Sequence, residues 1–217
     1  MRNLSPLEAR VLGVLVEKQH TVPDTYPLSL NALTAGCNQK TARSPVIEAS
    51  EAEVLTALDG LKSMSLVFEG SGSRVVRYEH NMGRVLNAPG AAVALLTVLM
   101  LRGPQTAAEL RLNSERLHKF ADISSVEGFL EELAERYPPR VVKLARAPGA
   151  REPRWAHLLC GEVAEPVWVA PPPGEAPVVA LGELAALKAE QTRLAQEVSD
   201  LRELVHKLAR ELGIESA

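Results

Sequence analysis

The chain has 217 residues, a formal net charge of −3 and an apolar fraction of 46%. This length suits one or two small domains, and the small net charge argues against a protein that coats nucleic acid by charge alone. The charge is unevenly distributed, however. Residues 81–160 contain 11 Lys and Arg against 8 Asp and Glu, whereas residues 161–217 contain 5 against 10. The middle of the chain is therefore basic and its end acidic.

Targeting and membrane signals are absent from the sequence. The N-terminal residues lack the apolar run of a signal peptide, and the longest apolar stretch, Ala91 to Leu101, is too short to span a bilayer. Cys37 and Cys160 lie far apart and form no metal-binding or redox spacing. We therefore predict a cytoplasmic protein with no disulfide and no contact with a membrane.

Residues 1–82 predict a domain of three helices followed by a β-hairpin. The helix starts are marked by capping residues, namely Ser5 with Glu8, then Ser29, then Ser50 with Glu53. Between the helices, residues 19–27 and 39–49 are polar and contain prolines, which predicts loops. The hairpin strands are expected at Leu66 to Glu69 and Arg74 to Glu79, joined by Gly70-Ser71-Gly72-Ser73.

Residues 83–163 predict the same order of elements. The expected helix starts are Asn87, Thr106 with Glu109, and Ser124 with Glu127. Strands at residues 141–144 and 155–158 flank a Pro148-Gly149 turn. Helix, short helix, helix and hairpin form the order of a winged-helix domain. The predicted fold class is α+β, mainly α, with two tandem winged-helix domains, a Pro-rich linker at 164–180 and a coiled-coil helix at 181–213.

The coiled-coil prediction depends on a heptad repeat in the C-terminal residues. Aliphatic side chains and one glutamine recur at the core positions, which are Leu184, Gln191, Val198, Val205 and Leu212 at a and Leu187, Leu194, Leu201 and Leu208 at d. Valine at a with leucine at d favours a parallel dimer. A trimer, or a helix that packs back on its own chain, is the alternative.

No constellation of residues in the sequence points to catalysis. The five histidines are scattered without metal-ligand spacing. Cys37 lies among apolar positions, which favours a buried, inert thiol. The glycines of residues 70–73 are followed by neither the lysine nor the helix of a phosphate-binding loop. We predict a protein that is not an enzyme and has no cofactor, no metal and no catalytic residue.

Nucleic-acid binding is the better supported function, although the third helix of each domain is not expected to contact the nucleic acid. These helices are acidic, so they would repel phosphate. The candidate contacts are cations of the loop before the third helix and of the two hairpins, namely Lys40, Arg43, Arg74, Arg77, Lys143, Arg146, Arg151 and Arg154. The alternative reading of these cations is ordinary surface charge.

Four segments together resemble one bacterial family. They are LEARVLGVLVEKQ, TYPLSLNALTAGCNQKTARSPV, SEAEVLTALDGL and HLLCGEV. They are similar to the YceH-like family of uncharacterised proteins over about residues 4–163. The resemblance implies a tandem winged-helix fold but no activity, cofactor or catalytic residue. The residues beyond 165 extend past the shorter family members.

The sequence therefore supports two functions. The leading prediction is a homodimeric DNA-associated protein, such as a transcriptional regulator, that contacts double-stranded DNA through its hairpins and loop. The alternative is a protein–protein interaction scaffold that binds a protein partner and does not contact DNA.

Overall fold

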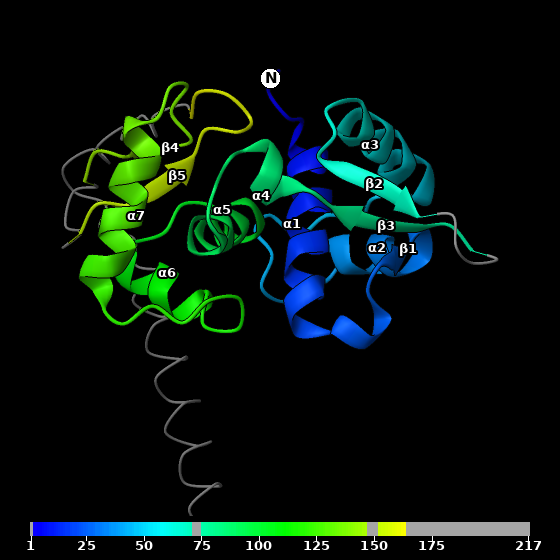
Figure 1. Cartoon of the computed structure of the whole chain (residues 1–217), viewed down its shortest axis with the longest axis horizontal. Coiled ribbons are helices and arrows are strands. Elements are labelled where there is room, and N and C mark those ends of the chain that lie inside the picture. Colours follow the sequence, from blue (N-terminus) through cyan, green and yellow to red (C-terminus); the bar gives the residue numbers. More distant parts are fainter. Residues whose placement is uncertain (1, 71–74, 147–151, 164–217) are drawn as a thin grey trace, which may run out of the picture. The chain divides into compact units, whose positions relative to one another are not determined.

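The computed structural model describes residues 2–70, 75–146 and 152–163. It is a mixed α/β structure, and about half of the described residues are helical (Figure 1). Two small antiparallel sheets accompany the helices. The elements, in chain order, are α1 (Pro6–Thr21), the 3-10 helix η1 (Pro23–Thr25), β1 (Leu28–Ser29), α2 (Leu30–Cys37), α3 (Glu51–Ser63), β2 (Val67–Gly70), β3 (Arg77–His80), α4 (Met82–Val85), α5 (Gly90–Arg102), α6 (Ala107–Asn113), α7 (Ile123–Glu135), β4 (Val141–Lys143) and β5 (Trp155–His157).

Most predicted helix starts are confirmed. The side chains of Ser5, Ser29, Ser50 and Thr106 each accept a hydrogen bond from the backbone three residues later. In three of these helices a glutamate at that position bonds back to the cap and completes a capping box. A cap of this kind stabilises a helix by about 1 kcal/mol, so the sequence fixes these starts locally.

Two predicted starts are wrong, because the chain is irregular before α5 and α7. Asn87 is not a helix cap; its φ is 48°, in the left-handed region, and it follows the short helix α4. The helix begins after Pro89 instead. The cap of α7 is Asp122, whose carboxylate accepts from Ser125 N at 2.7 Å, and not Ser124. An Asp-x-x-Ser pair forms a capping box as well as a Ser-x-x-Glu pair does.

The first sheet has the order β1-β3-β2, and its first strand was not predicted. The two residues of β1 pair antiparallel with Tyr78 and Arg77 of β3. Strands β2 and β3 form the first hairpin, with Val67 opposite His80. The Arg77 guanidinium donates to the carbonyl oxygens of Pro27, at 2.7 Å, and Thr25. These bonds fasten the hairpin to the segment between α1 and α2.

In the second half, β4 and β5 form the predicted second hairpin, with Val141 opposite His157. The expected turn at Pro148-Gly149 lies outside the described residues. Helix α7 packs against α5, α6 and β4 and buries Val126, Leu130 and Leu133. The predicted order of helix, short helix, helix and hairpin therefore occurs in both halves of the described chain.

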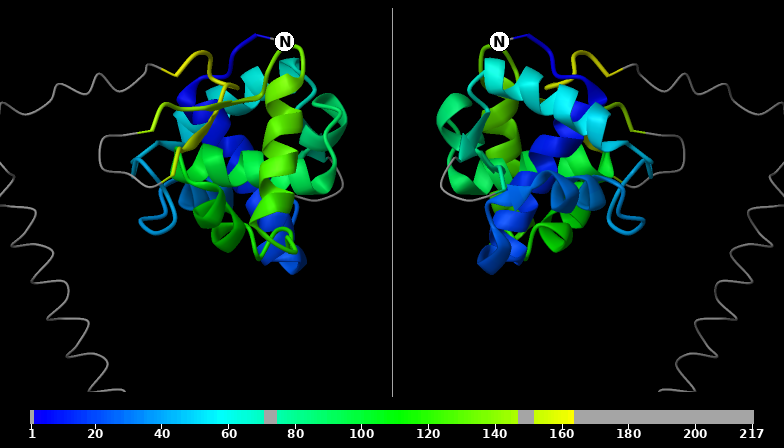
Figure 2. Two further views of the ribbon diagram at one scale, coloured as in Figure 1. Left: turned by 90° about the vertical axis from the view of Figure 1, so that its left-hand side faces the viewer. Right: turned by 90° about the vertical axis from the view of Figure 1, so that its right-hand side faces the viewer.

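Helices α1 and α5 join the two halves through one continuous hydrophobic core. Every residue of α5 from Ala91 to Leu101 is buried, because α1 packs on one side and the elements of the second half on the other (Figures 1 and 2). At Gly13 of α1 a Cβ atom would lie 3.0 Å from the Leu101 side chain. The two helices therefore approach closely at this glycine. The division into domains at residue 82 stays a prediction.

The two ends of the described chain also meet. The backbone N–H of Leu4 donates to the carbonyl oxygen of Leu159 at 2.8 Å. The Cys160 thiol lies 3.8 Å from the Ser5 carbonyl oxygen. The segment before α1 is thus held by the segment after β5.

No helix among residues 2–70, 75–146 and 152–163 is long and apolar enough to cross a membrane. The predicted linker and coiled coil, including every dimerisation residue named above, lie outside the described residues.

Candidate functional site

Arg43, one of the eight predicted phosphate contacts, is buried. Its guanidinium forms an ion pair with Glu17 of α1 at 2.5 Å and donates to the Gly36 carbonyl oxygen at 3.2 Å. None of its side chain is exposed, compared with 16% of the Glu17 side chain. This burial removes Arg43 from the surface that could meet a phosphate, and gives it a role in holding the loop before α3 against α1.

The other first-half candidates lie on the surface or outside the described residues. Lys40 is exposed and makes no ion pair with a described residue. Arg77 is exposed, although its guanidinium is held by the two carbonyl oxygens named above. Arg74 lies outside the described residues. The first hairpin therefore contributes one described cation, at the loop end of its paired strands.

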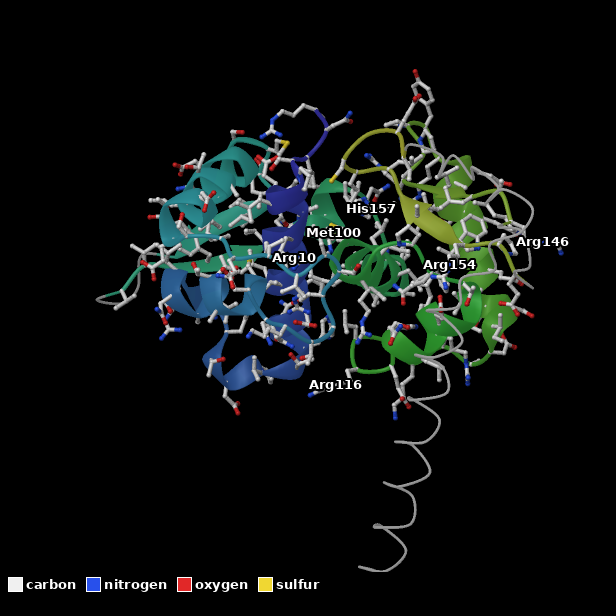
Figure 3. All side chains as sticks on the ribbon, turned by 180° about the vertical axis from the view of Figure 1, so that it is seen from behind. Arg10, Met100, Arg116, Arg146, Arg154 and His157 are labelled. Carbon is white, nitrogen blue, oxygen red and sulfur yellow. The ribbon has the colours of Figure 1, made fainter. Side chains whose placement is uncertain are left out.

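The second hairpin keeps three described cations, which point to different places. Lys143 Nζ lies 5.3 Å from the centre of the Trp155 ring, within the range of a cation–π contact. Arg154 donates to the Pro104 carbonyl oxygen at 2.8 Å and to Glu109 Oε1 at 3.1 Å. Figure 3 shows Arg146 at the outer edge of the second half, well away from Arg154. Arg151 lies outside the described residues.

A shallow groove of about 360 Å³ gathers Arg154 and Arg102, and its wall also includes Arg43, whose buried side chain is paired with Glu17. We call it the basic groove; it is lined by Ala42, Arg43, Ser44, Arg102, Pro104, Gln105, Glu109, Asn113 and Arg154. Glu109 is its only carboxylate among the lining residues. Arg102 was not among the predicted contacts. It could have been found from its position, because it is a basic residue at the end of an apolar helix, just before Gly103-Pro104.

The outer faces of the third helices carry exposed acids, as predicted. On α3 these are Glu51, Glu53 and Asp59, and on α7 they are Glu131, Glu132 and Glu135. Their inner faces are apolar and buried. Both helices therefore present negative charge to solvent.

A second, deeper cavity of about 570 Å³ lies between α1, the loop at 44–49, the end of α5 and the segment after β5. We call it the central cavity. Its walls include Ile47, Leu99, Met100 and Ala156, and its polar wall groups include Arg10 and His157 (Figure 3). Sequence reasoning did not single out Arg10 or His157, because neither belongs to a recognisable motif.

Burial suppresses the reactivity of the two cysteine thiols. Burial raises the pKa of the Cys37 thiol to about 12, and Cys37 is fully buried, as predicted. Burial also raises the pKa of Cys160, which favours the thiol over the reactive thiolate. Among the described residues, no group of three or more His, Cys, Asp and Glu side chains could hold a metal ion.

His157 makes the stability of the fold depend on pH. Burial lowers the pKa of its imidazole to about 4, and its Nδ1 atom is buried without a hydrogen-bond partner. In the unfolded chain the pKa is about 6.5. Between these two pKa values the unfolded state binds a proton at His157 and the folded state does not. The contribution of neutral His157 to the free energy of unfolding is therefore present above pH 6.5 and is lost as the pH falls toward 4.

We expect His157→Phe to remove the His157 contribution to this pH dependence and to leave that of His80, whose pKa burial also lowers to about 4. Denaturant unfolding at intervals from pH 7 to pH 4 gives the number of protons taken up on unfolding. Near pH 5 the variant should take up about one proton fewer than the wild type, because the titrating group is gone. Equal proton uptake by the two proteins would contradict the neutral, buried imidazole.

Comparison with known proteins places the chain in a family. Residues 4–150 match the family described as "Protein of unknown function, DUF480". The chain belongs to the DUF480 family. A UPF0502 protein of Burkholderia multivorans is 69% identical to it over 216 residues, which cover 100% of this chain and 92% of the relative. A UPF0502 protein of Burkholderia pseudomallei is 68% identical over 222 residues, covering 99% and 92%.

The expected resemblance to a bacterial family of unknown function is thereby confirmed in its broad form. The DUF480 match itself ends at residue 150, whereas the two relatives match essentially the whole chain. The extension beyond residue 165 is therefore shared by these relatives and is not peculiar to this chain.

Proposed function

We propose that this DUF480 protein is a DNA-associated homodimer, such as a transcriptional regulator, built from two winged-helix domains at residues 1–82 and 83–163. The repeated order of three helices and a hairpin supports this fold. The same fold is implied by the YceH-like resemblance. In winged-helix proteins the hairpins and neighbouring loops can contact phosphate, which positions the protein on the duplex.

The basic groove is the observation that carries the proposal. Arg102 and Arg154 line it together with the neutral side chains of Ser44 and Asn113, which can also donate to phosphate oxygens. Arg102 forms no ion pair with a described residue, and Arg154 remains 51% exposed beside Glu109. Phosphate would meet cations here, whereas it would meet carboxylates on the outer faces of α3 and α7.

We expect the double variant Arg102→Ala, Arg154→Ala to bind DNA more weakly and with less salt dependence. Fluorescence anisotropy with a mixed pool of labelled duplexes, at salt concentrations from about 50 to 200 mM, measures both. If each arginine neutralises one phosphate, the slope of log K against log salt should shrink by about 2. The loss should be similar for all sequences, because phosphate contacts carry no base specificity.

Arg84→Ala is a matched control. Arg84 is exposed on α4, beside the start of α5, whereas Arg102 lies at the opposite end of the same helix. Its replacement removes one unit of charge without touching the basic groove, so the slope should change little. Failure of the wild type to bind duplex DNA at low salt would refute the proposal. If Arg84→Ala lost as much binding per charge removed as the double variant does, only net charge would matter.

The homodimer rests on the heptads of residues 184–212. Two copies held together would raise the local concentration of weak phosphate contacts. Light scattering should give twice the chain mass of 23.4 kDa for the full-length protein, and the mass of one chain after removal of residues 178–217. A full-length monomer would refute the dimer, and three times the chain mass would indicate the trimer.

The alternative, a scaffold for a protein partner, is favoured by exposed apolar side chains on the first hairpin and the adjacent helix. Phe68 is 45% exposed, Val76 43% and Leu55 of α3 40%. Exposed apolar groups of this kind, next to acidic groups, are typical of protein-binding surfaces. Stoichiometric co-purification of one protein that is lost with Phe68→Ser, together with no binding to DNA, would support the scaffold.

A further inference from the structure

We propose that the central cavity binds a small organic carboxylate with an apolar body, held by Arg10. The central cavity is separate from the basic groove, and a ligand could occupy it whether or not the protein binds DNA.

Arg10 supplies the positive charge. Arg10 is only 4% exposed, yet it forms no ion pair with any acid of the described chain. One terminal nitrogen donates to the Cys37 carbonyl oxygen at 3.1 Å and the other to the Pro45 carbonyl oxygen at 2.6 Å. The Nε–H has no hydrogen-bond partner among the described residues. Of its five N–H donors, most are therefore unused.

A buried guanidinium without an anion is costly. Burial, together with the neighbouring Arg43, lowers the pKa of Arg10. The nearby carboxylate of Glu17 is already paired with Arg43, so it is not available to neutralise Arg10. A ligand carboxylate would supply the missing anion through charge-assisted hydrogen bonds, which are stronger than bonds to neutral groups.

The remaining walls select the body of the ligand. They are mostly aliphatic, with Ile47, Leu99, Met100 and Ala156 among them. His157 adds a neutral imidazole whose buried Nδ1 lacks a partner. A cavity of about 570 Å³ falls within the range of small-molecule sites, which combine apolar walls with a few polar groups.

The carboxylates of the cavity lie at its rim and not beside Arg10. Glu48 and Glu162 are exposed, and Glu53 is exposed and occupied as the capping partner of Ser50. Water screens such exposed charges. None of them forms an ion pair with Arg10, so a ligand carboxylate that points inward would be the counterion of that guanidinium.

The methyl group of Met100 offers a direct probe in the full-length protein. With ¹³C-labelled methionine methyls, titration with 3-phenylpropanoate should shift the Met100 signal and leave that of Met82, which is buried but does not line the cavity. The neutral isostere 3-phenylpropanamide should bind at least about tenfold more weakly, because it cannot supply the anion. Octanoate tests an aliphatic body of similar length.

Two variants assign the site. Arg10→Met should abolish the preference for the acid over the amide, with the Met82 signal showing that the fold is kept. Ile47→Trp occupies cavity volume while Arg10 itself is unchanged, and it should weaken binding of both ligands at least about tenfold. The proposal is overturned if neither carboxylate shifts Met100 at millimolar concentration, if acid and amide bind equally, or if Ile47→Trp binds as the wild type does.

Discussion

Replacing Glu17 by alanine should lower the free energy of unfolding by about 3–5 kcal/mol, because it leaves a buried arginine without its counterion. The Arg43 side chain is fully buried, and Glu17 is its only carboxylate partner among the described residues. Arg10, also buried, lies close enough to repel Arg43 electrostatically. Removing Glu17 would therefore leave two buried cations and no described acid between them.

Equilibrium denaturation monitored by circular dichroism measures this loss. Glu69→Ala is the matched control, since the Lys62–Glu69 ion pair at 2.9 Å is partly exposed on both sides and Lys62 keeps Asp59 as a second partner. We expect a change of about 0–1 kcal/mol for that variant. If Glu17→Ala were no more destabilising than Glu69→Ala, the buried pair would have no special importance for stability.

The second large effect concerns the shared core. Leu96→Ala in the middle of α5 should cost about 2–5 kcal/mol, because Leu96 is fully buried and its truncation leaves a cavity. Helix α5 packs against α1 in the first half and α7 in the second. The loss should therefore lower the stability of both halves together, in a single unfolding transition.

Two probes distinguish joint from separate unfolding. Methyl signals of Met64, which follows α3, and Met100, in α5, should disappear at the same denaturant concentration in the wild type and shift together in Leu96→Ala. Leu112→Ala is the control, since Leu112 is 69% exposed, and it should change stability by less than about 0.5 kcal/mol. Separate transitions for the two methyls would show that the halves unfold independently.

Local sequence signals predicted the elements well. Helix starts such as Ser5 and Thr106 were found because a capping box depends on residues only three apart. The error at Ser124 has the same origin, since two overlapping capping pairs compete and only the structure shows that Asp122 prevails. The two-residue strand β1 was missed because its pairing with Tyr78 is a long-range contact without a local pattern.

The site was less predictable, for a physical reason. Sequence reasoning treats an arginine as a surface residue, because arginine is almost never fully buried unless it is paired. Arg43 is paired with a residue 26 positions earlier, and Arg10 bonds to carbonyl oxygens 27 and 35 positions later. No periodicity reports such pairings, so neither the loss of Arg43 from the surface nor the central cavity could be anticipated.

The backbone bond between Leu4 and Leu159 has a consequence for how the protein is made. Among the described helices α1 is made first, whereas its partner α5 and the segment after β5 that holds its N-terminal end are made later. The face of α1 that α5 covers is therefore exposed until α5 has been made, a condition that favours aggregation or chaperone binding. Ribosome-bound chains that end before residue 160 should accordingly remain more sensitive to protease than the released protein.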